Sequence, residues 1–404
     1  MSKPTGPIPP AYLGHDELIL GGQCAVGLAE AGTPLFVYDF AMVRAQIERL
    51  RRAMPHGLRL HYAVKANPFP PLVRAITPLV DELDIASGGE LELTNGLGER
   101  SFAGPGKRDE ELAAAIRYDV TLNLESEGEA ERALKLAAAL GKRPRLAVRV
   151  NPPFQLKGSG MRMGGGAAPF GVDSEHVPAL VRRLVEADAD WRGFHIYAGS
   201  QSLDADAIVS TQAASVALAA ELAEAAGYAP PLVNLGGGFG VPYFAGDRSL
   251  DVDAIGEALK TTLAGRAAIL ATTHFALELG RWLVAEAGVY LTRIVDRKVS
   301  RGETFLVVDG GLHHQLAASG NFGTVVRRNY PVAVANRLSA APSETVNIVG
   351  CLCTPLDRLA DQVELPQAEL GDVIAIFLAG AYGASASPGG FLGHSPAREL
   401  LLDQ

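Results

Sequence analysis

The sequence predicts an α/β protein: a (β/α)8 TIM barrel followed by a C-terminal β-sheet domain. Eight short apolar runs alternate with helical stretches between residues 58 and 278, and eight is the strand number of a closed parallel barrel. After residue 282 the pattern changes to β-rich runs with few helical periods. A doubly wound sheet is the alternative, but no Gly-x-Gly-x-x-Gly follows the first strand.

We expect three parts. Residues 1–38 form an N-terminal segment that partly joins the β domain, 39–282 form the barrel, and 283–404 form the C-terminal β domain. A strand over 35–38 is followed by Asp39, a plausible cap for a helix that reaches about Met54.

The elements follow from apolar periodicity and from Gly and Pro breaks. Barrel strands are expected at 58–64, 82–86, 100–103, 120–124, 145–150, 193–197, 232–235 and 274–278. Helices are expected near 68–79, 88–98, 109–117, 126–140, 175–189, 204–227 and 251–270. The later β-rich runs are 283–294, 304–308, 346–350, 372–378 and 399–402, with a helical pattern only at 324–338.

Composition excludes several function classes. A net charge of −9 argues against nucleic acid or an anionic membrane as the main partner. The Ala-rich stretch 213–227 is interrupted by Glu221 and Glu224, so no apolar run is long enough to span a bilayer. Residues 1–10 lack the apolar core of a signal peptide, and three cysteines are too few for a disulfide framework. We expect a cytoplasmic protein.

Lys65 ends the first barrel strand, because Asn67-Pro68 breaks the chain directly after it. Burial there would lower the pKa of the amine and make it a nucleophile suited to Schiff-base chemistry. A lysine that reaches solvent from a strand end is the other interpretation. Other polar or glycine-rich positions also follow strand ends, where barrel active sites are built: Ser87, Asn151, Gly199-Ser200, Gly236–Gly238 and Glu278–Arg281.

The glycine run 236–238 would let backbone N–H groups approach a phosphate, although, taken alone, a tight turn is the more common reason for such a run. Glu278 could keep a pyridine nitrogen protonated, and Arg281 could grip a phosphate or carboxylate. An ion pair between them is the alternative.

The β domain contributes fewer candidates. Cys353 could act as a general acid, but it and Cys351 also fit buried hydrophobic positions. Tyr382, in a glycine-rich loop, either packs in the core or offers a hydroxyl to a ligand. No metal is expected, because no Cys/His cluster has ligand spacing. We place His313 and His314 on a strand, where adjacent side chains point to opposite faces.

Taken in order, these segments resemble the alanine racemase-like (fold-type III) pyridoxal-phosphate decarboxylases, the group that acts on ornithine, arginine and diaminopimelate. The resemblance spans about residues 30–390. It rests on His61-Tyr-Ala-Val-Lys65-Ala-Asn, Asp84-Ile-Ala-Ser87-Gly-Gly-Glu90, Arg149-Val-Asn151-Pro, Gly199-Ser200-Gln201, Gly236–Gly238, Glu278-Leu-Gly-Arg281, Cys353–Asp357 and Gly380–Gly383.

The resemblance implies that Lys65 binds pyridoxal phosphate covalently, that Glu278 faces its pyridine nitrogen, and that Cys353 protonates the α-carbon after CO₂ leaves. It implies further cofactor-binding residues: Asp84, Arg149, Tyr197, Ser200, Gly236, Gly237, Gly238, Gly280, Arg281 and Tyr382. It also implies a head-to-tail homodimer, in which the cysteine and tyrosine loops complete the neighbouring subunit's barrel site.

Departures from the family pattern bear on the cofactor and the substrate. Tyr197 replaces a ring-stacking histidine but can still stack, and His195 points to the same face of the strand. Glu278-Leu-Gly-Arg281 replaces Glu-Pro-Gly-Arg and keeps both charges. Thr354 stands where ornithine and diaminopimelate enzymes place an acid after the cysteine. A neutral hydroxyl forgoes a charge-assisted bond to a distal ammonium, about 1.5–3 kcal/mol.

We therefore expect decarboxylation of an L-α-amino acid other than a free dibasic one, possibly a glutamyl group on an acyl carrier protein. Substrate candidates are Arg281, Asp309, Arg327, Arg328, Thr354 and Asp357. Cys353-Thr-Pro-Leu-Asp357 and the Tyr382 loop resemble a subgroup with the glutamyl–acyl carrier protein decarboxylase of aminoglycoside biosynthesis and exosortase-associated decarboxylases. The alternatives are a decarboxylase of free diaminopimelate or ornithine, an amino-acid racemase, and a non-catalytic pyridoxal-phosphate-binding relative.

Overall fold

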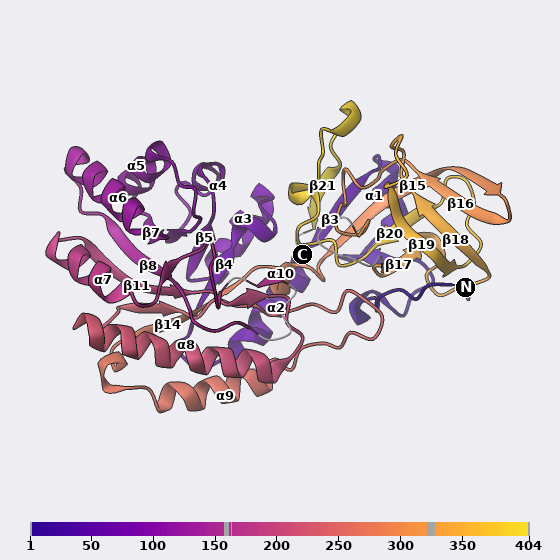
Figure 1. Cartoon of the computed structure of the whole chain (residues 1–404). Helices are drawn as coiled ribbons and strands as arrows, with labels where there is room; N and C mark the ends of the chain where they lie inside the picture. Colours follow the sequence, from indigo (N-terminus) through magenta and orange to yellow (C-terminus); the bar gives the residue numbers. More distant parts are fainter. Residues whose placement is uncertain (1, 157–160, 163, 321–327, 403–404) are drawn as a thin grey trace. The chain divides into compact units, whose positions relative to one another are not determined.

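A computed structural model describes residues 2–156, 161, 162, 164–320 and 328–402. The chain forms two compact units (Figure 1). The barrel unit comprises residues 47–240 and 249–280, and the β unit comprises 1–46, 241–248 and 281–404. The main divisions of the chain follow residues 46 and 280. The divisions expected from the sequence follow residues 38 and 282. The sequence also gave no sign that 241–248 belongs with the β unit.

Eight parallel strands close the barrel, in the order β4-β5-β6-β7-β8-β11-β13-β14 and back to β4, which confirms the predicted fold class. The strands are β4 (Arg59–Ala63), β5 (Glu82–Ile85), β6 (Arg100–Phe102), β7 (Thr121–Leu124), β8 (Arg145–Asn151), β11 (Asp190–Ile196), β13 (Leu232–Asn234) and β14 (His274–Leu279). Short β10 (Val172–Asp173) pairs with β8, and β9 (Met161–Arg162) pairs with β12 (Gly199–Ser200).

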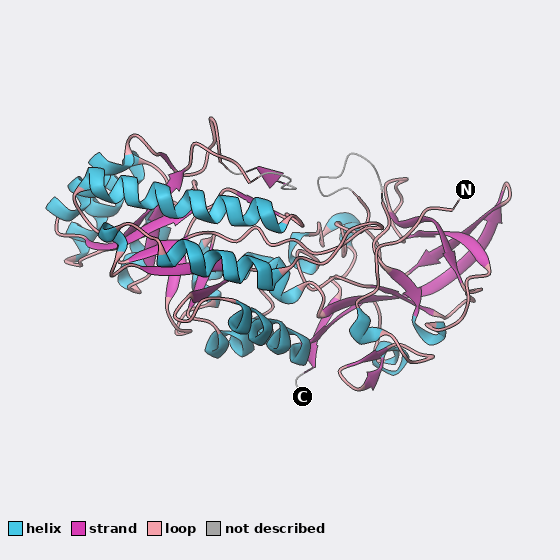
Figure 2. Cartoon of the chain, turned by 90° about the horizontal axis from the view of Figure 1, so that it is seen from below, coloured by secondary structure: helices cyan, strands magenta, loops and turns pink. Residues whose placement is uncertain are grey.

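Helices flank the strands of this unit, as Figure 2 shows in cyan. They are α3 (Pro70–Ile76), α4 (Gly88–Leu93), α5 (Asp109–Arg117), α6 (Glu127–Leu140), α7 (Val177–Glu186), α8 (Ala205–Ala226) and α9 (Val252–Ala264). Several of these helices have a Ser or Asp residue at the N-cap. Ser87, Ser126, Asp204 and Asp251 each accept the backbone N–H three residues on, and so begin α4, α6, α8 and α9. The strand-to-helix junctions are thereby fixed at one rim of the barrel.

The β unit is built on an eight-stranded sheet with the path β17-β20-β15-β16-β18-β19, in which β3 pairs with both β15 and β21. Its strands are β3 (Leu35–Asp39), β15 (Gly288–Ser300), β16 (Glu303–Val308), β17 (Val332–Val334), β18 (Glu344–Val349), β19 (Arg358–Leu365), β20 (Val373–Ile376) and β21 (Arg398–Leu402). A separate pair is formed by β1 (Ile19–Leu20) and β2 (Gln23–Cys24). Helices α1 (Ala25–Glu30) and α10 (Arg281–Val284) belong to this unit, and α2 (Phe40–Ala53) is divided between the two units at residue 46.

Several expectations for this region need correction. The run 283–294 is not one strand, because α10 precedes β15. The helix expected over 324–338 is wrong in its described part: β17 is followed only by a 3-10 turn at 335–337, and Pro331 is incompatible with a continuous helix. Strand β19 was not expected. The cap at Asp39 is confirmed, because its Oδ1 accepts the N–H of Ala41 at 2.9 Å.

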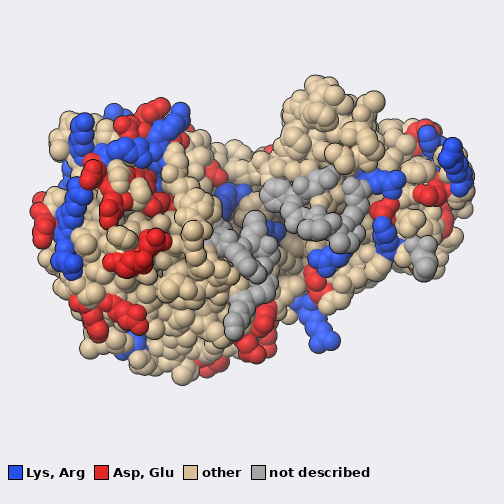
Figure 3. All heavy atoms as spheres, in the orientation of Figure 1, with Lys and Arg blue, Asp and Glu red and all other residues tan. Residues whose placement is uncertain are grey.

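Two surface properties bear on function. Within the described ranges, none of the helices has both the length and the apolar character needed to cross a bilayer. On the face drawn in Figure 3, Lys and Arg side chains are interspersed with Asp and Glu over the barrel unit. Among the described residues of that face, no broad basic surface of the kind that binds nucleic acid is visible.

Candidate active site

Three polar side chains meet at the end of the barrel strands. Lys65 follows β4 and its Nζ lies 3.2 Å from Oε1 of Glu278, near the end of β14. The other carboxylate oxygen, Oε2, lies 2.9 Å from Nε2 of His195 on β11. The Glu278 side chain is 3% exposed whereas that of Lys65 is 43% exposed. The carboxylate is therefore clamped at both oxygens beside an amine that a ligand can reach.

The surroundings keep Glu278 ionised. Burial alone would raise the pKa of its carboxyl group, but the Lys65 ammonium and the His195 hydrogen bond outweigh burial. Arg149 acts in the same direction, so the pKa of Glu278 lies well below its usual range. A buried carboxylate of this kind can hold a proton on a heteroaromatic nitrogen through a charge-assisted hydrogen bond.

Tyr197 joins this group. The Lys65 Nζ lies 5.5 Å from the centroid of the Tyr197 ring, and the rings of Tyr197 and His195 are 6.2 Å apart. His195 was not among the predicted site residues. The signal for it was its position two residues before Tyr197, which puts both on one face of the strand.

The glycine run 236–238 has no room for side chains. A Cβ atom at Gly237 would lie 2.1 Å from the carbonyl oxygen of Glu278, and one at Gly238 would lie 2.9 Å from that of Gly199. Gly236 and Gly238 also have φ values of 70° and 83°, in the left-handed region. These glycines are required for the close approach of neighbouring strand ends.

The same segment offers free donors. In the described part of the chain, the N–H groups of Gly237 and Gly238 have no hydrogen-bond partner, and the buried hydroxyl of Ser200 has none either. Backbone amides on glycines beside an unpaired hydroxyl fit an anionic ligand such as a phosphate. The residues present therefore fit the phosphate of a pyridoxal cofactor.

Gly280 packs tightly beside the segment that carries Lys65. A Cβ atom there would lie 2.7 Å from the Cβ atom of Ala66. Its role in the barrel unit is close packing of the end of β14 against the residues around Lys65.

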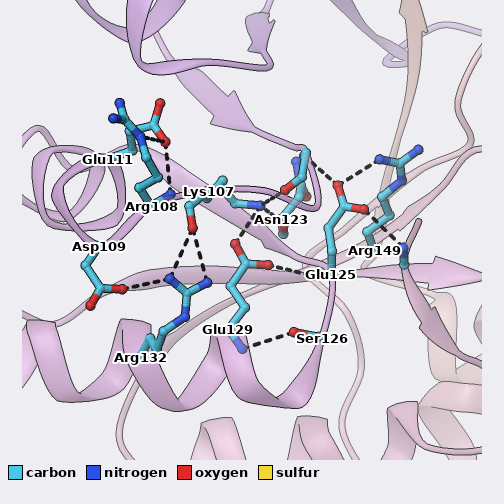
Figure 4. A network of polar contacts seen from close by, with 12 residues as sticks. Lys107, Arg108, Asp109, Glu111, Asn123, Glu125, Ser126, Glu129, Arg132 and Arg149 are labelled. Carbon is cyan, nitrogen blue, oxygen red and sulfur yellow. Dashed lines mark hydrogen bonds and ion pairs between the residues drawn. The ribbon is translucent and has the colours of Figure 1, made fainter. Parts of the chain in front are cut away.

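Arg149, on β8, belongs to a buried ion-pair network (Figure 4). Its Nη1 donates to Oε1 of Glu125 at 2.8 Å, and Oε2 of Glu125 accepts the N–H of Gly171 at 3.1 Å. Nearby, Nζ of Lys107 lies 2.7 Å from Oε1 of Glu129 and donates to two backbone carbonyls. This network was not predicted from the sequence, and it holds Arg149 in place.

Burial shapes the charges of this network. Burial lowers the pKa of Lys107, although the nearby Glu129 carboxylate acts in the opposite direction. Burial would raise the pKa of Glu125, but Arg149 and Lys107 outweigh it, so that the pKa of Glu125 is lowered.

Asp84, on β5, lies in a second buried cluster. It accepts a hydrogen bond from the Ser101 hydroxyl, and its Oδ2 lies 3.4 Å from Nδ1 of His61. The other ring nitrogen of His61 lies 3.5 Å from Glu82. Burial would lower the pKa of His61, but the two carboxylates raise it to about 9. A cofactor contact by Asp84 stays a prediction.

In the β unit, Arg281 and Tyr382 come together. The Arg281 guanidinium carbon lies 4.6 Å from the Tyr382 ring centroid, and Nη1 donates to the Tyr243 hydroxyl at 3.2 Å. Tyr243 belongs to the 241–248 segment, which accounts for its membership of this unit. Two residues predicted to bind the cofactor phosphate are thus neighbours.

Two carboxylates of the β unit that were predicted to bind substrate already accept hydrogen bonds from this unit. Asp357 Oδ1 and Oδ2 accept the N–H groups of Leu312 and Leu352 at 2.6 and 2.8 Å. Asp309 Oδ1 accepts the Thr292 hydroxyl and the Arg293 N–H at 2.7 and 2.9 Å, and its Oδ2 accepts the Thr33 hydroxyl. Both carboxylates hold the unit's own backbone and side chains in place, so we do not carry them into the proposed site.

Cys353 is exposed and Thr354 partly exposed. Arg328 is exposed, with its guanidinium carbon 3.8 Å from the Phe244 ring centroid. Arg327 lies outside the described residues.

His313 and His314 contradict the strand expected for them. Both lie in a turn after β16, and their ring centroids are 3.7 Å apart. The preceding Gly310-Gly311 ends the strand, so the two side chains do not point to opposite faces.

Comparison with known proteins agrees with this geometry. The family model described as "Pyridoxal-dependent decarboxylase, pyridoxal binding domain" matches residues 40–285. An L-glutamyl-[BtrI acyl-carrier protein] decarboxylase from Niallia circulans is 34% identical over 379 residues, which cover 91% of this chain and 88% of that protein.

Diaminopimelate decarboxylases are also similar. The protein from Aquifex aeolicus is 31% identical over 380 residues, which cover 92% of this chain and 87% of the relative. A crystal structure of the M. jannaschii enzyme in co-complex with L-lysine has a TM-score of 0.86 at 26% identity, covering 98% of this chain and 92% of that one. The chain belongs to the pyridoxal-dependent decarboxylase family and is a pyridoxal-phosphate-dependent carboxy-lyase.

Proposed function

We propose that this decarboxylase acts on an L-α-amino acid whose side chain ends without a free ammonium group. A glutamyl group bound to an acyl carrier protein is the first candidate, supported by the 34% identity to a glutamyl-carrier decarboxylase. The observation that carries the proposal is Thr354, a neutral residue directly after Cys353. Two nearby acids, Asp309 and Asp357, cannot substitute for a missing carboxylate because their oxygens already accept the protein's own donors.

The proposed mechanism assigns one task to each group. When bound, pyridoxal phosphate supplies an electron sink for the pair released as the carboxylate leaves. Lys65 holds the cofactor covalently, and ionised Glu278, oriented by His195, holds the proton of the ring nitrogen. The amides of Gly237 and Gly238 and the Ser200 hydroxyl bind the phosphate.

Further residues complete the proposed site. Tyr197, beside Lys65, would pack against the bound cofactor. Arg281, stacked on Tyr382, provides a cation for the phosphate or the substrate carboxylate. Cys353 Sγ delivers a proton to the α-carbon. Asp84 and Arg149 would contact the cofactor from the barrel interior. Ser101 and Glu125 hold their side chains in place there.

We further propose a homodimer in which the Cys353 loop completes the partner subunit's barrel site. Support comes from the exposure of the Cys353 thiol and from the resemblance of its loop to the family pattern. Cys24, Cys351 and Cys353 are free thiols, which supports a reducing, cytoplasmic compartment.

A complementation experiment tests the composite sites. Lys65→Ala and Cys353→Ala are inactivated in different parts of such a site, so mixed subunits regain function. Random pairing makes half of the dimers mixed, each with one intact site of two, which predicts about one quarter of wild-type activity. Activity that never exceeds that of the separate variants would overturn the composite site.

Substrate choice is tested by a mass-spectrometric screen for decarboxylated product. The cofactor-loaded enzyme is offered free ornithine, lysine, arginine, meso-diaminopimelate and glutamate, together with a glutamyl-carrier thioester. We expect turnover of the thioester and none of the free dibasic amino acids. Turnover of a dibasic amino acid at a comparable rate would refute the interpretation of Thr354.

A further inference from the structure

Three loops of the β unit bring two histidines and a cysteine together. His313 follows β16, Cys351 follows β18, and His394 lies in the segment between β20 and β21. That segment projects from the sheet in Figure 1. One ligand atom of each residue lies within 4.8 Å of those of the other two, and Sγ of Cys351 is 4.0 Å from Nδ1 of His394.

These separations suit a small metal ion. Zinc binds thiolate sulfur at about 2.3 Å and imidazole nitrogen at about 2.0–2.1 Å, which places the two donor atoms about 3.5 Å apart in a tetrahedral site. The observed 4.0 Å therefore needs only a small side-chain adjustment.

His313 and His314 have different hydrogen-bonding states. Nε2 of His314 lies 2.9 Å from the carbonyl oxygen of Ser395, and its Nδ1 lies 3.3 Å from the Tyr290 hydroxyl. One tautomer satisfies both contacts: Nε2–H donates and Nδ1 accepts. His314 therefore has no nitrogen left for a metal, but it fixes the backbone beside His394 before any ion binds.

His313 is fully buried, and neither of its ring nitrogens has a hydrogen-bond partner among the described residues. Leaving a buried polar group unpaired costs about 1–3 kcal/mol. A metal ion bound to one of these nitrogens would remove that cost.

We propose that His313, Cys351 and His394 form a binding site for a transition-metal ion, with Zn²⁺ as the ion that suits one thiolate and two imidazoles. The described residues supply three ligands, and water completes the coordination. Metal binding would deprotonate Cys351 and tie together the three loops, one of which carries Cys353 two residues further on. The expectation of no metal rested on the absence of Cys/His ligand spacing in the sequence and on the strand wrongly assigned to His313 and His314.

The test is zinc titration of the cofactor-loaded, metal-stripped enzyme, followed by elemental analysis. Cys351→Ser and His394→Ala each remove one ligand, whereas Cys24→Ser removes a thiol elsewhere in the β unit. We expect one zinc per chain in the wild type and in Cys24→Ser, and loss of this zinc in both ligand variants. Mg²⁺, which prefers oxygen ligands, should not compete.

X-ray absorption at the zinc edge identifies the ligands, with one sulfur at about 2.3 Å and nitrogens at about 2.0–2.1 Å. His394 is exposed, so its removal should leave the unfolding temperature of the metal-free protein unchanged. Absence of bound zinc, unaltered stoichiometry in both ligand variants, or a zinc environment without sulfur would each overturn the site.

Discussion

The charged centre of the barrel unit and the cysteine loop of the β unit show opposite degrees of preorganisation. Glu278 is 3% exposed and both of its oxygens are held, by Lys65 and His195. Cys353 is exposed, and Thr354 beside it is only partly buried. The comparison teaches that Lys65, His195 and Glu278 are fixed within one barrel. Cys353, the proposed acid, would join a site only through contact with another surface. The predictions below test this contrast in decreasing order of effect.

Lys65→Ala should have the largest effect, because no other group in the described barrel replaces its amine beside Glu278. We expect loss of detectable decarboxylation and of the absorbance of lysine-bound cofactor. Lys135→Ala, at an exposed position of α6, is the matched control and should behave as wild type. Unchanged cofactor absorbance in Lys65→Ala would contradict the assignment.

Cys353→Ala should reduce kcat by roughly 10²–10⁴-fold, the range of general acid catalysis, while cofactor content stays unchanged. Steady-state kinetics with product analysis measures this effect, and Cys24→Ala serves as the control. If the Cys353 variant retains wild-type kcat and a single product, the thiol is not the proton donor.

Glu278→Gln should lower kcat by about 10²–10³-fold, comparable to removal of one fixed electrostatic group. The neutral amide cannot balance the proton on the ring nitrogen, although it fills the same space. Cofactor binding measured by absorbance should be largely retained. A variant with normal kcat would show that Glu278 does not face the ring.

His195→Ala should lower kcat by about 10–100-fold, because a hydrogen bond to a charged group is worth about 1.5–3 kcal/mol. Since His195 lowers the pKa of Glu278, its loss raises that pKa and moves the acidic limb of the kcat–pH profile to higher pH. His195→Gln keeps a donor and should partly restore the profile. An unshifted profile in His195→Ala would exclude this positioning role.

The smallest effect concerns stability. The pKa of His61 is raised from 6.5 to about 9, so its charged contacts stabilise the fold fully below pH 6.5 and are lost as pH rises through 9. His61→Gln lacks this titration, and its unfolding temperature should fall less between pH 6.5 and 9. Thermal unfolding at several pH values measures how the unfolding temperature of each protein depends on pH. An equal pH dependence in the wild type and in His61→Gln would contradict this prediction.

Local patterns predicted the fold well because barrel strands are short apolar runs with clear breaks. The strands ending at Ala63, Ile85 and Leu124 were placed within two residues of their observed bounds. Lys65 and Glu278 follow strand ends, as the sequence indicates, and the structure brings them within 3.2 Å of each other. Their roles toward the cofactor stay predictions.

What the sequence did not predict depends on distant pairing. His195 and Glu278 are 83 residues apart, and their contact exists only once the barrel closes. The Lys107–Glu129 pair likewise needs the ends of neighbouring strand–helix units side by side. The turn at His313 follows Gly310-Gly311, which separate it from the strand that ends at Val308, so the β-rich context alone does not predict its conformation.

The most direct test of the central claim is borohydride reduction of the cofactor-loaded enzyme, followed by peptide mass mapping. Reduction fixes the bond between cofactor and lysine, so the pyridoxyl group stays on the residue that held it. We predict a single modified peptide, with the label on Lys65. A label on another lysine, or no label on a catalytically active enzyme, would contradict the account.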